Sequence, residues 1–324
     1  MTRAVVFGYH NVGVRCLKVL LAHGVEVPLV ITHDDSAGET IWFGSVARTC
    51  AEYGIRALAP ADPNTASIVA RIAEARPDFI FSFYYRRMLA PAVLALPSRG
   101  ALNMHGSLLP KYRGRAPVNW AIIHGEPETG ATLHYMGDKP DNGDIVAQTS
   151  VPILPDDVAA EVFVKVTVAA ELTLHRVLPA LLAGTAPRIP QDHGESSYFG
   201  GRKPEDGVID WSQSAVAIHN LVRAVAPPYP GARTLIDGHP ARLLRTRVIG
   251  ATVPAVMAPA FDIADGRITV RCGGGGILEV LELEIDDAIV GAGAFAQWRA
   301  AHAAAALPGR IGAHQPASAP DQHD

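Results

Sequence analysis

The short stretch Asn103–His105 combines two side chains that suit acyl-transfer chemistry. The amide of Asn103 can donate to a developing oxyanion, and the imidazole of His105 can move a proton. Because one residue separates them, both side chains point to the same side if the segment is a β-strand. An Asn-x-His pair alone is weak evidence, so its interpretation depends on the surrounding sequence.

Two nearby segments strengthen this interpretation. The loop 106–120 is either a basic surface loop or, with its Leu-Leu-Pro and Arg-Gly-Arg stretches, a shaped ligand wall. Downstream, Asp141 lies in a Pro-Asp-Asn-Gly sequence whose residues are ordinary turn formers. If this carboxylate reaches His105, it favours the protonated imidazole and fixes the orientation of the ring.

The ordered set Asn103-x-His105-x-Ser-Leu-Leu-Pro-x-x-Arg-Gly, with Asp141-x-Gly downstream, resembles the folate-dependent formyltransferases. The resemblance implies 10-formyltetrahydrofolate as co-substrate and Asn103, His105 and Asp141 as the catalytic trio. Over about residues 3–285 the likeness is closest to the branch that formylates the 4″-amine of UDP-4-amino-4-deoxy-L-arabinose, in lipid A modification and polymyxin resistance. That branch is usually half of a bifunctional protein, whereas this chain resembles a stand-alone formyltransferase.

The resemblance also implies a set of folate contacts, although nothing local in the sequence marks a uridine site. For Met88 and Leu89 the alternative is core packing. Arg115 is suited to bidentate contact with an anionic ligand. The implied folate-contacting residues are Arg87, Met88, Leu89, Arg115, Gly137, Asp138, Lys139, Pro140 and Asp141.

The elements that must position these residues alternate between strand-like and helix-like patterns through residues 1–190. This alternation predicts a catalytic domain with a Rossmann-like, doubly wound, mostly parallel sheet. Asn103 and His105 end one strand, at the carboxyl edge where open α/β sheets bind ligands. The expected strands are Ala4–Phe7, Pro28–Thr32, Phe79–Phe83, Ala101–His105, Ala131–Met136 and Ile145–Val151. The expected helices are Val12–His23, Ser45–Tyr53, Asn64–Glu74 (with Asn64 as N-cap), Pro117–His124 and Val158–Leu182.

A linker-like stretch separates this domain from a second one over residues 205–304. One helix, Ser214–Val225, precedes several short β-like runs, which favour a small OB-like β-barrel. A last helix is expected over Phe295–Ala306. The segment 307–324 has the composition of a disordered tail.

Several functions are excluded by what the sequence lacks. The first turn, Gly8–Gly13, has no GxGxxG spacing, so we expect no NAD and assign both glycines to a tight turn and close packing. The dispersed His and Cys residues show no metal-ligand spacing, so we expect no metal. Three separated cysteines, no signal peptide and no run of 18 apolar residues predict a cytoplasmic protein without membrane insertion.

The charge distribution bears on the acceptor. The net charge of the chain is −4. Residues 205–304 carry eight Arg, no Lys and eleven acidic residues, so this domain as a whole lacks the positive charge that RNA binding needs. A small RNA contact through the local patch of Arg242, Arg245 and Arg247 remains an alternative. We therefore expect a nucleotide-sugar acceptor and no nucleic acid. Methionyl-tRNA and another nucleotide-linked amino sugar remain alternatives, the intact trio argues against a non-enzymatic folate-binding protein, and the oligomeric state stays open.

Overall fold

A computed structural model describes residues 1–35 and 40–302 of the 324-residue chain. These residues form two compact units. The first unit comprises residues 1–117, 128–152 and 163–200, and the second comprises 118–127, 153–162 and the described residues from 201 onward. The expected disordered tail and the last residues of the expected Phe295–Ala306 helix lie outside the described residues.

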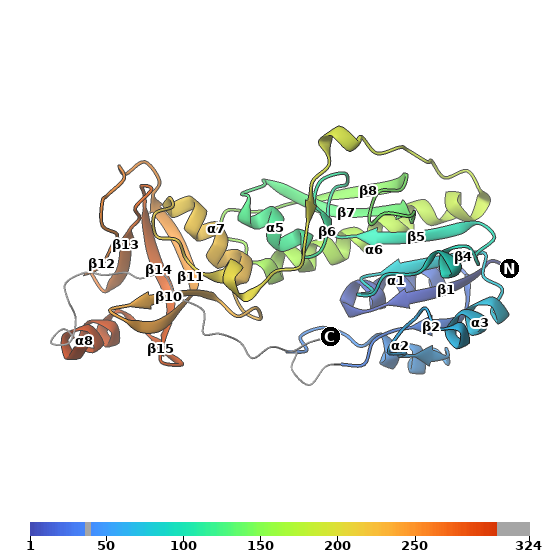
Figure 1. Cartoon of the computed structure of the whole chain (residues 1–324), viewed down its shortest axis with the longest axis horizontal. Coiled ribbons are helices and arrows are strands. Elements are labelled where there is room, and N and C mark those ends of the chain that lie inside the picture. The colour runs from blue at the N-terminus through green and yellow to red at the C-terminus, as the bar shows by residue number, and fades with distance from the viewer. Residues whose placement is uncertain (36–39, 303–324) are drawn as a thin grey trace. The chain divides into compact units, whose positions relative to one another are not determined.

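The first unit is built around a seven-stranded sheet with the order β3-β2-β1-β4-β5-β7-β8 (Figure 1). Its first five strands are parallel, and β7 and β8 are antiparallel to their neighbours. The bounds are β1 Arg3–Gly8, β2 Glu26–Ile31, β3 Ala57–Leu58, β4 Phe79–Phe83, β5 Gly100–His105, β7 Glu128–Tyr135 and β8 Ile145–Pro152. The sequence-based prediction of a mostly parallel sheet is confirmed.

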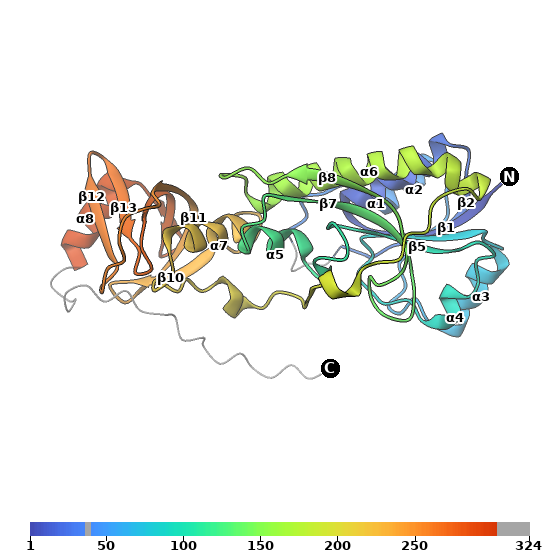
Figure 2. The same cartoon turned by 90° about the horizontal axis from the view of Figure 1, so that it is seen from above.

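Helices cover both faces of this sheet. In Figure 2, α1 and α6 lie on one face and α3 and α4 lie on the other. Both faces of the sheet are apolar and need a cover, as strand β1 illustrates. Its Val5 and Phe7 pack with Ile68 and Ile72 of α3, whereas the alternate residues of β1 are buried on the opposite side. The helices of the first unit are α1 His10–Ala22, α2 Val46–Glu52, α3 Ala66–Glu74, α4 Pro91–Leu94 and most of α6 Ala159–Ala183, whereas α5 Pro117–Ile123 falls almost entirely in the second unit.

The first turn packs as the sequence predicts. A Cβ added at Gly13 would lie 2.9 Å from Val46 Cγ2 and 3.1 Å from the carbonyl carbon of Gly8. Helix α1 begins at His10, two residues earlier than expected. The ring of His10 is buried and stacks on Phe43 with centroids 3.8 Å apart, which fixes the first residues of the helix.

The prediction that Asn64 caps the next helix is wrong. The N-cap of α3 is Thr65, and the side chain of Asn64 instead accepts from Ala90 N at 2.7 Å and donates to Met88 O at 3.0 Å. An Asn amide serves a long-range backbone contact as well as a cap, so its residue type did not distinguish them. As a result, Asn64 anchors the loop that leads into α4.

The second unit contains an antiparallel sheet of six strands, in agreement with the all-β pattern of the sequence. The order is β10-β11-β14-β13-β12, and β15 also pairs with β14. Its core gathers Trp211, Leu243, Phe261 and Phe295 with residues of α7. The bounds are α7 Ala215–Val225, β10 Ala232–Ile236, β11 His239–Gly250, β12 Ala260–Ala264, β13 Arg267–Arg271, β14 Ile277–Ile285, β15 Ala288–Val290 and α8 Ala292–His302. Strands β12 and β15 were not predicted.

Helix α6 meets the length and hydropathy criteria for a membrane span among the described residues. Half of its most apolar 18-residue window is buried inside the protein, and the core helix of a soluble protein passes the same test. The criterion alone is therefore weak evidence for a span.

Candidate active site

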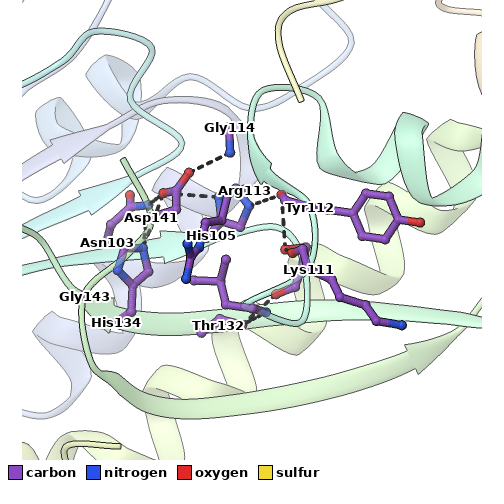
Figure 3. Close-up of polar contacts among 12 residues, drawn as sticks. Asn103, His105, Lys111, Tyr112, Arg113, Gly114, Thr132, His134, Asp141 and Gly143 are labelled. Carbon is purple, nitrogen blue, oxygen red and sulfur yellow. Dashed lines mark hydrogen bonds and ion pairs between the residues drawn. The ribbon is translucent and has the colours of Figure 1, made fainter. Parts of the chain in front are cut away.

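Strand β5 brings Asn103 and His105 to the carboxyl end of the parallel strands. Both side chains contact the carboxylate of Asp141, with Asn103 Nδ2 3.3 Å and His105 Nδ1 3.5 Å from its Oδ1 (Figure 3). The strand periodicity of two thus places both groups on the side that the sequence predicts. His105 is only 5% exposed, so water screens this pair of groups poorly.

The loop after β5 supplies the second partner of His105. Thr132 Oγ1 donates to Ser107 O at 2.6 Å, and Ser107 Oγ donates to Lys111 O at 2.7 Å. These bonds close the loop and direct the carbonyl of Tyr112 to His105 Nε2, at 2.7 Å. Tyr112 adopts a φ of 58°, a left-handed conformation that is uncommon for a non-glycine residue.

The contact with Tyr112 determines where His105 carries a proton. A backbone carbonyl only accepts, so Nε2 of His105 must be the protonated nitrogen. Its Nδ1 then faces the Asp141 carboxylate and either keeps a lone pair or takes a second proton. Of the two ring nitrogens, Nδ1 is therefore the one placed to gain or lose a proton.

Asp141 lies in the turn between β7 and β8 with a φ of 53°. Its Oδ2 accepts from the backbone N–H of Gly114 at 2.9 Å. Gln191, which lies far along the chain, also holds the backbone of the turn: its amide donates to Asp141 O at 2.9 Å and to Gly143 O at 2.7 Å. Asp141 is thereby fixed by backbone and side-chain bonds from three separate segments.

The surroundings of Asp141 favour its ionised form. Burial by itself would raise the pKa of the Asp141 carboxyl, but the imidazoles of His105 and His134 and the N–H of Gly114 outweigh it. Together they hold the pKa well below its usual range. The carboxylate is thus a fixed negative charge beside His105.

His134 is a site residue that the sequence analysis missed. It lies directly opposite Asn103 in the antiparallel pairing of β5 and β7 and is 1% exposed. Its Nδ1 donates to Tyr135 O at 2.8 Å, so Nε2 of the neutral ring accepts from Asn103 Nδ2 at 3.3 Å, whereas Nε2 of the imidazolium donates to the Asp141 carboxylate. The same Nε2 lies 3.5 Å from Asp141 Oδ1. Only the register of the two strands could have revealed this neighbour.

The expected folate contacts fall on the loop before α4, on the turn that holds Asp141 and at Arg115, which directly follows the short strand Arg113–Gly114. In the loop before α4, Arg87 and Met88 are exposed, whereas Leu89 is buried in the core, so only its backbone can reach a ligand. Core packing thus holds for Leu89 and not for Met88, which is 61% exposed. Arg115 is exposed and its N–H donates to Phe199 O at 2.9 Å. In the turn that holds Asp141, the preceding residues are exposed, namely Gly137, Asp138, Lys139 and Pro140.

The described residues contain no group of three or more His, Cys, Asp or Glu side chains arranged to hold a metal ion. The three cysteines are free and buried, and burial raises the pKa of Cys50 and Cys272 to about 11. Their thiols therefore stay protonated near neutral pH and are poor nucleophiles.

Sequence profiles and solved structures agree on the kind of protein this resembles. Residues 4–178 match the Formyl transferase profile, and residues 202–299 match the Formyl transferase, C-terminal domain profile. An N-formyltransferase from Helicobacter canadensis, in complex with folinic acid and dTDP-3-aminofucose, shares 21% identity at a TM-score of 0.69, covering 86% of this chain and 99% of that one.

Two further structures show the same fold. The sugar 3N-formyl transferase WlaRD, solved in the presence of dTDP and 5-N-formyl-THF, shares 20% identity at a TM-score of 0.68, covering 86% of this chain and 97% of its own. A sugar N-formyltransferase from Shewanella sp. shares 17% identity at a TM-score of 0.59, covering 74% of this chain and 95% of its own. At these identities the likeness establishes the fold.

Proposed function

Because the chain belongs to the formyl transferase family and is an enzyme of that type, we propose that it moves the formyl group of 10-formyltetrahydrofolate to the amine of a nucleotide-linked amino sugar. The observation that carries the proposal is the convergence of Asn103 and His105 on Asp141 at the carboxyl edge of the sheet. The solved relatives of this fold, bound to folates and deoxythymidine nucleotides or a nucleotide sugar, support the substrate classes.

The proposed step is a transfer between two nitrogens. The lone pair of the sugar amine attacks the formyl carbon, and the amide of Asn103 donates to the oxygen that becomes negative. The contacts of Asn103 Nδ2 with His134 and Asp141 are both 3.3 Å long, so one N–H of the amide can turn to the substrate at little cost. The amine proton passes to Nδ1 of His105 and then to N10 of the folate as the carbon–N10 bond breaks.

Within this scheme Asp141 and His134 are positioning residues. Asp141, held ionised, stabilises the imidazolium that forms when His105 takes the amine proton. His134 accepts from Nδ2 of Asn103 and so fixes which end of the amide faces the reaction. The folate is held, in this proposal, by the exposed residues of the loop before α4 and of the turn that precedes Asp141, and by Arg115.

The acceptor that we propose is UDP-4-amino-4-deoxy-L-arabinose, as the resemblance implies, which would link the enzyme to lipid A modification and polymyxin resistance. Within the second unit the arginines support a small acceptor over a transfer RNA. Arg242 forms an ion pair with Glu284, and Arg247 lies 3.8 Å from Asp156, so two members of the local basic patch already face acids. Arg223 is buried, so it cannot meet a phosphate backbone.

A side-by-side assay tests the acceptor. The purified protein is supplied with 10-formyltetrahydrofolate and, in turn, UDP-4-amino-4-deoxy-L-arabinose, a dTDP-linked amino sugar and methionyl-tRNA at physiological salt. We expect formylation of the UDP sugar, with the His105→Ala variant as the inactive control. Formylation of methionyl-tRNA without reaction of either sugar nucleotide contradicts the proposal, and preference for the dTDP sugar corrects the acceptor alone.

A further inference from the structure

A cavity of about 410 Å³ lies beside the turn that holds Asp141, in the first unit. Its lining includes Arg113, Lys139 and His193, together with Tyr198 and with Pro140 and Asn142 of the turn. No role follows for Arg113 or His193 from the formyl-transfer scheme. The question is what a cavity lined by these cationic and donor groups is suited to bind.

Arg113 is the central group of this cavity. It is 9% exposed, and its guanidinium donates to Gln191 Oε1 at 2.6 and 3.2 Å and to His193 Nδ1 at 3.0 Å. All of these acceptors are neutral, and within residues 1–35 and 40–302 no carboxylate lies at ion-pair distance from Arg113. A largely buried guanidinium normally has an anionic partner, because taking the charge out of water is costly.

The neighbours of Arg113 add donors and no negative charge. Because a guanidinium only donates, His193 accepts at Nδ1, and its neutral ring carries the proton at Nε2. Lys139 adds an ammonium on the exposed side of the cavity, and Tyr198 adds an aromatic ring. The Asp141 carboxylate is directed away, toward His105 and Gly114.

From this arrangement we infer that the cavity is a subsite for an anionic group of carboxylate or phosphate type, recognised by Nη1 of Arg113, the guanidinium nitrogen that bonds neither Gln191 nor His193, and by the charge of Lys139. The inference rests on the proposed function, which supplies two sources of such a group. One is the diphosphate of the nucleotide sugar, and the other is the glutamate carboxylates of the folate. Gln191 bonds both Arg113 and the backbone of Asp141, so an anion in this subsite also steadies the turn that carries the catalytic carboxylate.

Binding measurements on the full chain test the subsite and identify the source. The probes are UDP, 5-formyltetrahydrofolate and 5-formyltetrahydropteroate, which lacks the glutamate. The variants are Arg113→Lys, which keeps the charge but loses the planar guanidinium with its Nη1 donors, and Lys139→Gln on the surface, with the exposed Lys18→Gln on α1 as matched control. Loss of a charge-assisted bond should raise Kd by roughly 10-fold or more.

Weaker binding of UDP in the variants identifies the diphosphate as the occupant. Weaker binding of 5-formyltetrahydrofolate, with the pteroate unaffected, identifies the glutamate. If both variants bind UDP and 5-formyltetrahydrofolate within about 2-fold of wild type, the inference is wrong. If Arg113→Lys does not fold, Lys139→Gln and His193→Ala decide by the same criterion. A wild-type protein that binds through these residues but formylates no acceptor refutes the proposed function and leaves the subsite intact.

Discussion

His105 in the first unit and His219 in the second are both buried and both donate from Nε2 to a backbone carbonyl, but they differ at Nδ1. For His105 the carbonyl belongs to Tyr112 and for His219 to Pro155, at 2.7 and 2.9 Å. His105 presents Nδ1 to the Asp141 carboxylate, whereas His219 Nδ1 lies 3.0 Å from the hydroxyl of Thr246.

The partner at Nδ1 decides what each ring is suited to do. A carboxylate can stabilise a second proton on the imidazole, so His105 is placed to take and release one. A hydroxyl can donate to the unprotonated nitrogen, so His219 is held as a neutral structural group. Asp156 Oδ1 also lies 3.6 Å from His219, but beside Nε2, which already donates to Pro155. Two histidines of similar burial therefore differ in chemistry through the partner at Nδ1, and the variants described below test this difference.

The largest effect is expected from removing the reacting groups themselves. His105→Ala should lower kcat by about 10²–10⁴-fold through loss of proton transfer, and Asn103→Ala by about 10²–10³-fold through loss of an oxyanion donor. Both groups act mainly on the transition state, so the Kd of 5-formyltetrahydrofolate should change little. Steady-state kinetics and calorimetry check both statements. Near-normal turnover in either folded variant would remove the proposed mechanism.

Asp141→Asn should lower kcat by about 10²-fold, because the amide keeps the shape of the side chain but cannot stabilise an imidazolium. Since its neighbours hold the pKa of Asp141 below the usual range, the wild-type carboxylate stays ionised throughout the pH range above ~4. The variant should thus be impaired at every pH in that range. A variant that equals wild type at any such pH would show that the charge of Asp141 is not needed.

His134 should show an intermediate effect that separates orientation from binding. His134→Leu removes the acceptor for Asn103 and should lower kcat by roughly 10-fold with KM for the folate nearly unchanged. His134→Gln offers an amide oxygen as acceptor and should recover part of that loss. Equal kcat in the Leu and Gln variants would mean that His134 only fills space in β7.

Short-range patterns in the sequence predicted the parts of the site that depend on one strand. The spacing of Asn103 and His105 placed both on one side of β5, and strand–helix alternation predicted the sheet that holds them. The contact between Asp141 and His105 was expected through the family resemblance and a residue type suited to it. Its geometry depends on bonds from Gly114 and Gln191, which no local pattern indicates.

What remained hidden depends on long-range pairing. His134 neighbours Asn103 only through the register of β5 and β7. Arg113 contacts Gln191 because the segment that contains Gln191 continues into β9 (Tyr198–Phe199), which pairs with β6 (Arg113–Gly114). A polar residue type gives no signal for such partners. Asn64 shows the same limit: its residue type is typical of a helix N-cap, but its side chain bonds the backbone of a distant loop.

The smallest effect on activity, and the clearest counterpart to His105, is expected at His219. Burial lowers the pKa of His219 below its ordinary value and Arg223 adds to this, against the raising influence of the Pro155 carbonyl and of Asp156. The unfolded chain therefore takes up the proton first as the pH falls, which favours unfolding. The contribution of His219 to the unfolding free energy should be complete above pH ~6.5 and decline as the pH drops toward the lowered folded-state pKa.

The test compares wild type with His219→Gln, whose amide is neutral at every pH and can still donate to the Pro155 carbonyl. Urea unfolding at a series of pH values should show the stability advantage of wild type shrinking as the pH falls through ~6.5. The formyl-transfer rate at neutral pH should be unchanged, because Thr246 and Pro155, the partners of His219, take no part in the proposed chemistry. A difference in unfolding free energy that stays constant with pH would contradict the neutral, structural role of this ring, and with it the contrast to His105.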